Sequence, residues 1–294
     1  MFSYLLKIIF IVSFNSKNNL FMRLSNSFFS SLFLLFSMNL LEFHTVQASA
    51  FRILIEALKE ILTDANFEFD DNGLKIVAMD STHTVLVHLR LNSENLEKYV
   101  CKQKQTLGIN LLNFYKLMKM MGNNDTLKLY VTDDNTSVLN IEIENSDKNS
   151  VTRFKLNLMD LNNKQIDIPK AEFESVITMP SVDFQKICRD MSNISEEIEI
   201  KSVGDQLIFS CKGQFAEQET SIGTSTGGLS FLHNDQVLIQ GIYSLNYLVL
   251  FSKCTNLCNS VEIYLKNDFP LITKYNIASL GEIKLCLAPK FEES

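Results

Sequence analysis

The sequence predicts an α+β chain of two similar domains, in which helices pack on antiparallel sheets. Three observations lead to this fold class. An amphipathic helix followed by a hairpin of two strands recurs four times, with helices that begin near residues 51, 110, 181 and 244. With 46% apolar and 21% charged residues, the 294-residue chain can bury large cores. Ten Gly and four Pro leave little material for flexible linkers.

The first unit shows the repeated pattern most clearly. Its helix carries apolar residues on one face, namely Phe51, Leu54, Ile55, Leu58, Ile61 and Leu62. The turn Asp70-Asp71-Asn72-Gly73 then joins a strand containing Phe67 and Phe69 to the apolar run 74–79. Such turn residues between apolar runs predict a hairpin.

The other three units repeat this order of elements. The second has a helix over 110–121 and strands near 127–131 and 138–143. In the third, Ser181 is expected to be the N-cap of a helix, and strands follow around 198–200 and 207–209. The fourth has a helix over 244–253 and strands over 261–265 and 271–275.

The predicted domain boundaries follow from these units. Residues 1–37 contain no acid, 33 of the 37 are Phe, Ile, Leu, Asn, Lys, Ser or Tyr, and Met38 precedes the first patterned strand. We therefore expect a non-native or disordered extension over 1–37, a first domain over 38–157, a connector over 158–170 and a second domain over 171–294. A signal peptide is the alternative for the extension, although no Ala-x-Ala site follows its apolar run closely; polar interruptions argue against a membrane span.

The charge of the chain limits how it could bind nucleic acid. The net charge is −7, from 27 basic and 34 acidic residues; residues 1–37 hold three of the basic ones, so the rest has 24 against 34, or −10. Coating of nucleic acid by bulk charge is excluded, and any contact needs local positive charge. The polar faces of the four helices offer it, at Arg52, Lys59, Lys116, Lys119, Lys186, Arg189 and Lys253. Taken singly, each pair is also compatible with an ordinary solvated face.

No pattern in the sequence indicates an enzyme. Neither a G-x-x-x-x-G-K-[ST] nor a G-x-G-x-x-G loop is present, and the six Cys form no C-x-x-C pair. The acids of Asp70-Asp71 and Asp133-Asp134 stand at equivalent hairpin turns, where Asp is favoured by local hydrogen bonding. His83 has no recognisable nucleophile partner. We expect no catalytic residue, no metal site and no cofactor.

Several short motifs carry a family resemblance. Ile55-Glu56-Ala57-Leu58-Lys59, Met79-Asp80-Ser81, Leu158-Met159-Asp160-Leu161, Ile187-Cys188-Arg189-Asp190 and Leu287-Ala288-Pro289-Lys290 occur in order along the chain. From Leu41 to Ser294 the sequence resembles proliferating cell nuclear antigen (PCNA), the eukaryotic-type DNA sliding clamp. The resemblance implies the DNA clamp fold, two similar domains per subunit, and a closed homotrimeric ring with helices lining the hole.

The resemblance also implies a function and partners. A clamp of this family encircles double-stranded DNA without sequence preference, is placed there by an ATP-dependent clamp loader, and serves as processivity factor and docking platform for DNA polymerase and other replication and repair proteins. PIP-box proteins dock a short hydrophobic segment under the connector. The matching positions here are Met79, His83, Leu86, Ile166, Ile168, Phe173, Pro270, Ala288, Pro289 and Phe291.

The assembly and setting follow from the same resemblance. Ring closure is expected between the segments 151–156 of one subunit and 213–222 of the next, and the compartment is expected to be the nucleus, or a cytoplasmic replication site if the protein is viral. No membrane partner is expected. Two alternatives stay open: a checkpoint-type clamp subunit of a mixed ring, and a clamp recruited to transcription.

Overall fold

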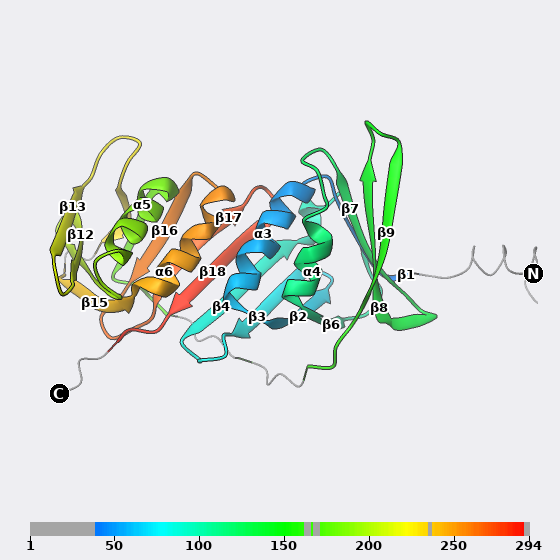
Figure 1. Ribbon diagram of the computed structural model, residues 1–294, viewed down its shortest axis with the longest axis horizontal. Coiled ribbons are helices and arrows are strands. Elements are labelled where there is room, and N and C mark those ends of the chain that lie inside the picture. The colour runs from blue at the N-terminus through cyan, green and yellow to red at the C-terminus, as the bar shows by residue number, and fades with distance from the viewer. Residues whose placement is uncertain (1–38, 162–165, 167–170, 235–236, 291–294) are drawn as a thin grey trace, which may run out of the picture.

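The computed structural model describes residues 39–161, 166, 171–234 and 237–290; the expected extension over 1–37 lies outside these residues. Two similar halves lie side by side along the long axis of the molecule (Figure 1). In each half a five-stranded and a four-stranded antiparallel set of strands carry two helices. The predicted α+β fold of two similar domains is confirmed.

The first half contains nine strands and two α-helices. Their order is β1 (Asn39–Thr45), α3 (Ala48–Ile61), β2 (Asp64–Asp70), β3 (Gly73–Met79), β4 (Val85–Asn92), the 3-10 turn η1 (Ser93–Asn95), β5 (Lys98–Cys101), β6 (Gln105–Asn110), α4 (Leu111–Met118), β7 (Thr126–Thr132), β8 (Asn135–Asn145) and β9 (Ser150–Asn157).

The second half repeats this order. It runs β10 (Ser175–Pro180), α5 (Ser181–Ser192), β11 (Glu197–Val203), β12 (Gln206–Lys212), β13 (Glu217–Gly223), β14 (Ser230–Asn234), β15 (Ile239–Ser244), α6 (Leu245–Phe251), the 3-10 turn η2 (Ser252–Asn256), β16 (Ser260–Leu265), β17 (Leu271–Ile277) and β18 (Gly281–Leu287). All four helix–hairpin units predicted from the sequence are present, in the predicted order.

The strands form three sheets, and the middle sheet joins the halves. Its order is β14-β10-β16-β17-β18-β4-β3-β2-β6, with β18 pairing antiparallel to β4 from Gly281 opposite Leu91 to Leu287 opposite Val85. The outer sheets have the orders β5-β1-β7-β8-β9 and β13-β12-β11-β15. In this single chain β9 and β13 are therefore edge strands, and they lie at opposite ends of the molecule (Figure 1).

Apolar spacing determines how the helices sit on the sheets. In α3 the core face is fully buried at Phe51, Leu54 and Leu58, and Phe51 packs edge-on against Phe114 of α4, 6.1 Å between ring centroids. The side chain of Asn110 caps α4 by accepting a hydrogen bond from the Asn113 N–H at 2.9 Å. With their apolar faces packed in this way, all four helices cover the same side of the sheets (Figure 1).

Two local expectations were wrong. Pro180, not Ser181, is the N-cap of α5; Ser181 lies inside the helix and donates its hydroxyl proton to the Cys258 carbonyl at 2.7 Å, so the long-range contact replaces the cap. Helix α4 ends at Met118, three residues before the expected end, because the N–H groups of Met120 and Met121 bond to the carbonyls three residues before them, and Gly122 N–H bonds to the Asp125 carboxylate at 2.7 Å in the loop that follows.

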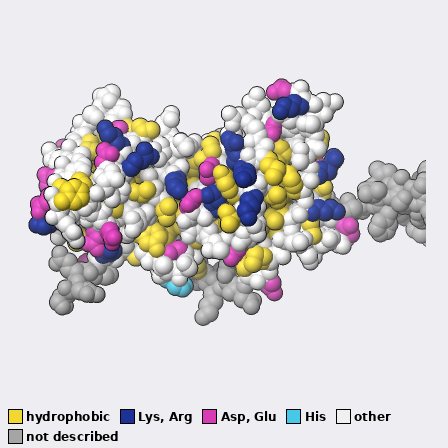
Figure 2. All heavy atoms as spheres, in the orientation of Figure 1, with side chains coloured by type: hydrophobic (Ala, Val, Ile, Leu, Met, Phe, Trp, Pro, Cys, Tyr) yellow, Lys and Arg dark blue, Asp and Glu magenta, His cyan; other side chains and the backbone are white. Residues whose placement is uncertain are grey.

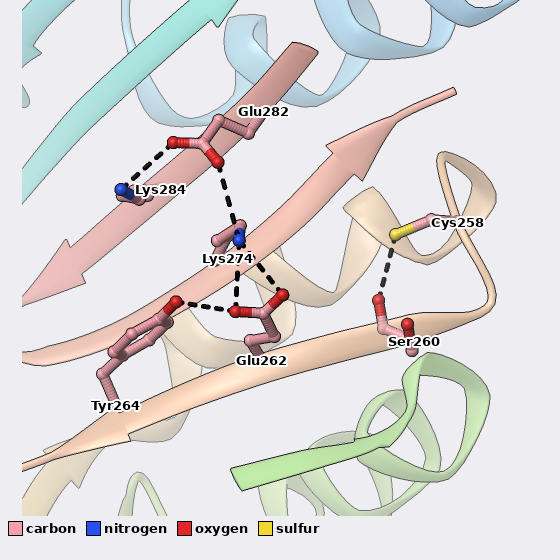
Figure 3. Close-up of polar contacts among 7 residues, drawn as sticks. All are labelled: Cys258, Ser260, Glu262, Tyr264, Lys274, Glu282 and Lys284. Carbon is pink, nitrogen blue, oxygen red and sulfur yellow. Dashed lines mark hydrogen bonds and ion pairs between the residues drawn. The ribbon is translucent and has the colours of Figure 1, made fainter. Parts of the chain in front are cut away.

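The opposite, outer side of the middle sheet carries a ladder of charges. Lys274 on β17 bridges Glu262 of β16 at 3.1 Å and Glu282 of β18 at 3.6 Å, and Glu282 also pairs with Lys284 at 3.1 Å (Figure 3). Tyr264 donates to Glu262 at 2.6 Å, and the Cys258 thiol donates to the Ser260 carbonyl (Figure 3). The outer side is thus polar where the helix side is apolar.

Candidate nucleic-acid interface and partner groove

The helices α4 and α5 present basic side chains in the same way. Residues 111–120 and 181–190 show the same succession of buried, half-buried and exposed positions. Lys116 corresponds to Lys186, and Lys119 to Arg189; all four are exposed. The period of the helix forces this outcome, because the core face is taken by Phe114 and Met118 in α4 and by Phe184 and Cys188 in α5.

The basic residues of α3 and η2 are more constrained. Arg52 donates to the Met121 carbonyl at 2.9 Å and to Asn123 Oδ1 at 3.0 Å, which ties α3 to the loop after α4. Lys59 pairs with Glu60, lies 4.7 Å above the ring of Tyr115, and keeps only 15% of its side chain exposed. Lys253 pairs with the same Glu60 at 3.2 Å.

Glu60 therefore pairs with two of the basic residues on this face. The hydrogen bond from Lys59 lowers the pKa of Glu60; burial opposes this effect, and Lys253 adds to it. Glu60 is ionised at neutral pH and neutralises part of the charge of two predicted DNA contacts. Nearby, burial and the Glu56 carboxylate raise the pKa of Tyr115, which keeps that phenol neutral.

The predicted basic residues lie on one side of the molecule. Figure 2 shows Lys and Arg side chains along the helix face, densest over α3 and α4, with acidic side chains between them. The face combines exposed cations on α4 and α5 with cations already held by protein groups on α3 and η2. It can contact phosphates, which carry no sequence information.

Several of the predicted partner-groove residues lie at one end of the middle sheet. Met79 on β3 is 39% exposed and lies opposite the half-buried Leu86 on β4. Ala288 and Pro289 follow β18, and the Ala288 N–H donates to the Thr84 carbonyl at 3.0 Å. Because Leu271 pairs with Leu287, Pro270 lies at the same end of the sheet.

The remaining groove residues divide into described and undescribed positions. Phe173 packs edge-on against Tyr264 at 5.3 Å and Phe269 at 5.6 Å, next to Pro270. Ile166 is half-buried, whereas Ile168 and Phe291 lie outside the described residues. His83 is exposed in the turn that leads from β3 into β4, with φ of 58°.

Sequence reasoning missed the group that holds this turn. Asp80, only 6% exposed, accepts hydrogen bonds from the N–H groups of Thr82, Thr84 and Val85 at 3.2, 2.8 and 2.7 Å. It also accepts from the Thr82 hydroxyl and, at 3.1 Å, from the Tyr247 hydroxyl of α6. The Asp-Ser-Thr sequence signals the turn, but nothing local signals Tyr247, 167 residues away.

Two other features, a membrane-spanning helix and a metal-binding cluster, are absent from the described residues. No helix there is long and apolar enough to cross a membrane. In the same residues no group of three or more His, Cys, Asp or Glu side chains is placed to hold a metal ion.

Two repeats of helices on sheets, joined edge to edge and carrying cations on the helix face, define a protein of the DNA clamp class. Comparison with known proteins gives the family. Residues 40–166 match the model of the proliferating cell nuclear antigen N-terminal domain, and residues 167–290 match that of its C-terminal domain. The chain is 37% identical over 254 residues to the probable DNA polymerase sliding clamp 1 of Paramecium bursaria Chlorella virus 1, covering 85% of this chain and 97% of the relative. The chain belongs to the PCNA family.

Proposed function

We propose that this protein is a DNA sliding clamp that closes into a homotrimeric ring around duplex DNA and holds DNA polymerase and other replication and repair proteins at the template. The observation that carries the proposal is the single face formed by α3, α4, α5 and α6, with cations at corresponding positions of α4 and α5 (Figure 1). Lining a central hole with this face would place the cations against DNA phosphates. The proposed ring would be opened by a separate ATP-dependent loader.

Contact with DNA should be weak, so that the ring can slide. The chain beyond residue 37 carries a net charge of −10 by the count above, which repels DNA from the outside. The helix face supplies phosphate contacts without base readout. Retention on DNA should therefore depend on topology and not on affinity.

The test uses rings loaded on nicked circles by a cognate loader, after which the circles are cut. Rings should slide off the new ends, and replacing Lys116 and Lys119 by Glu should reduce loading and polymerase processivity while the trimer stays intact. Replacing Lys75 and Arg90 by Glu is the matched control, because these exposed residues lie on the outer side with the same charge change. Retention on open-ended DNA, or full processivity in the Lys116/Lys119 variant, would refute the mechanism.

The partner groove is the second part of the proposal. The half-exposed apolar residues Met79, Leu86, Ala288 and Pro289 meet where β3, β4 and β18 end, which supports docking of the hydrophobic segment of a PIP-box peptide. Ile166→Ala and Phe291→Ala should each weaken peptide binding by about 1 to 3 kcal/mol, as truncation of buried contact residues does. Leu232→Ala, an exposed apolar residue on β14, is the control. Unchanged peptide affinity in both groove variants would contradict this assignment.

The mass of the purified assembly separates the proposed homotrimer from a subunit of a mixed ring. A mass of three chains at micromolar concentration supports the homotrimer; a monomer would contradict it. We place the protein where DNA is replicated, either in a nucleus or at a cytoplasmic site of viral replication, and microscopy of the tagged protein beside newly made DNA tests this.

A further inference from the structure

The internal repeat of the chain indicates how two copies would join. Strands β4 and β18 form the seam between the two halves, and each has an equivalent strand in the other half. Matching hairpin β2–β3 to β11–β12 shifts residues by 133, as from Gly73 to Gln206. The registers β3·β4 and β12·β13 then match β4 to β13, with Leu86 equivalent to Glu217 and His88 to Glu219.

The same reasoning matches β9 to β18. Strand β7 matches β16 with Thr126 equivalent to Ser260, as both begin the second hairpin of their half. The registers β7·β8 and β8·β9, compared with β16·β17 and β17·β18, make Arg153 equivalent to Lys284 and Lys155 to Cys286. The seam of β18 with β4 inside the chain is therefore the internal equivalent of a contact between β9 of one copy and β13 of another.

The internal seam fixes the register of that contact. Lys284 lies opposite His88, and Cys286 opposite Leu86. Carried over to the equivalent residues, Arg153 lies opposite Glu219 and Lys155 opposite Glu217 of the second copy. Within the described residues each of these strands has one edge without a partner strand, and an edge of this kind is open to pairing with another chain.

The charges of the two edges are complementary in this register. Within β9 the apolar Phe154 and Leu156 are half-buried, while Arg153 and Lys155 alternate with them and are exposed on the outer side. On β13 the exposed Glu217 and Glu219 also alternate to the outer side, because Gln218 pairs with the core residue Cys211. Antiparallel pairing would therefore bring two cations and two carboxylates together on one face.

The apolar part of the contact is smaller than in the internal seam. Inside the chain, the core-facing pairs are Ile283 with Leu89, Leu285 with Val87 and Leu287 with Val85, all fully buried. Their equivalents between copies are Thr152 with Thr220, Phe154 with Gln218 and Leu156 with Ala216. With fewer apolar atoms to bury, charge makes a larger part of the selectivity.

We propose that the ring contact is selected by a charge match, Arg153 with Glu219 and Lys155 with Glu217, between β9 of one copy and β13 of the next. This inference rests on the ring proposed above. The existing partners of these groups do not prevent it: the Arg153–Glu142 pair and the Lys212–Glu217 pair involve side chains that are 66% exposed or more on Arg153, Lys212 and Glu217. Exposed pairs of this kind exchange at little cost.

The test is a set of charge reversals measured by analytical ultracentrifugation over a concentration series. Arg153→Glu/Lys155→Glu and Glu217→Lys/Glu219→Lys should each raise the dissociation constant of the ring contact by roughly 10- to 100-fold, because two attractive cross-strand pairs become repulsive. The variant that carries all four reversals should return towards the wild-type value. Lys75→Glu/Arg90→Glu has the same charge change as the first variant and should leave the assembly unchanged.

Single exchanges test the register itself. Arg153→Glu should be rescued by Glu219→Arg, which restores an opposite pair, and not by Glu217→Arg, which leaves two mismatched pairs. An equimolar mixture of the two double variants should not form three-membered rings, since a ring of three from two kinds must contain one contact between like copies. Wild-type contacts should also weaken as the Debye length shrinks from about 10 Å at 0.1 M salt to about 3 Å at 1 M.

The outcomes separate this inference from the ring proposal. A monomeric wild-type protein would remove the ring itself. A trimeric wild type whose dissociation constant is unchanged by either reversal, or whose fourfold variant shows no recovery while its circular dichroism is native, would keep the ring and refute the charge match. Equal rescue by Glu219→Arg and Glu217→Arg would refute the register.

Discussion

The hydroxyl of Tyr247 ties the two halves together at the edge of the partner groove. It donates to Asp80 at 3.1 Å and lies 2.8 Å from the Thr82 hydroxyl. Asp80 and Thr82 belong to the turn that carries His83, and Tyr247 belongs to α6 on the helix face. The contact therefore connects the two surfaces for which we propose functions.

Replacing Tyr247 by Phe removes this hydroxyl donor and keeps the aromatic side chain. A hydrogen bond to a charged acceptor contributes about 1.5 to 3 kcal/mol. Tyr247 is only half-buried, so water can replace part of the bond, and Asp80 keeps three backbone donors. We expect a loss of about 1 to 2 kcal/mol in the free energy of unfolding, with faster hydrogen exchange of the Val85 N–H.

The assay is urea unfolding at fixed protein concentration, because assembly adds to apparent stability. Tyr130→Phe is the matched control, since its hydroxyl reaches Glu142 only at 3.5 Å and should cost less than about 0.5 kcal/mol. In an Asp80→Asn background Tyr247→Phe should cost clearly less, which a double-mutant cycle measures. A loss equal to that of the control, or the same loss with and without Asp80, would show that the contact does not hold the halves together.

Three further outcomes are expected. Gly281→Ala should destabilise the protein by about 1 to 3 kcal/mol or more in urea unfolding, because its Cβ would lie 2.0 Å from the Arg90 carbonyl oxygen in the β18–β4 seam, whereas Gly223→Ala meets nothing within 4 Å and should be neutral. Acid should destabilise the wild type, because two carboxyl groups have lowered pKa values. Burial by itself would raise the pKa of both, but hydrogen bonds hold the pKa of Asp80 below its ordinary value of 3.8. Lys98, Asn39 and Lys128 likewise hold the pKa of Glu42 below its ordinary value of 4.5. Their contribution is present above these ordinary values and is lost as the pH falls through the lowered ones, so Asp80→Asn should flatten the pH dependence of unfolding below about pH 5. Glu60→Gln should strengthen binding to DNA.

The helix–hairpin units could be predicted because their signals are local. The turn at Asp70 forms as expected, with the Asn72 N–H donating to Asp70 Oδ1 at 2.7 Å, and the apolar spacing of α3 fixes its buried face. The β18–β4 seam joins residues 190 to 202 positions apart, from Gly281 opposite Leu91 to Leu287 opposite Val85, and no local pattern specifies which strand edges meet. Ser181 shows the same limit, since a distant carbonyl determines where its hydroxyl bonds.

The candidate DNA contacts divide in the same way. Lys116, Lys119, Lys186 and Arg189 are exposed because the helix period and a buried Phe dictate it. The partners of Arg52 and Lys59 come from other turns of the fold, and the sequence gives no distance between them. Helix faces can therefore be read from spacing, but the net charge that a face presents depends on tertiary neighbours.

Glu60 shows how much this dependence matters for sliding. Its carboxylate, kept ionised by Lys59 and Lys253 against the effect of burial, is shared by two of the seven candidate phosphate contacts. Glu60→Gln would free Lys253, which is 44% exposed, to bind a phosphate, while Lys59 stays largely covered by Tyr115.

One added phosphate contact should steepen the dependence of log K on log salt by about 0.9 and raise affinity for short duplex several-fold at low salt. Fluorescence anisotropy across a salt series measures both. Glu94→Gln, an exposed acid on η1, makes the same charge change elsewhere and should alter neither. An identical salt slope for wild type and Glu60→Gln would mean that Lys253 does not reach DNA, and that the contacts lie on α4 and α5 alone.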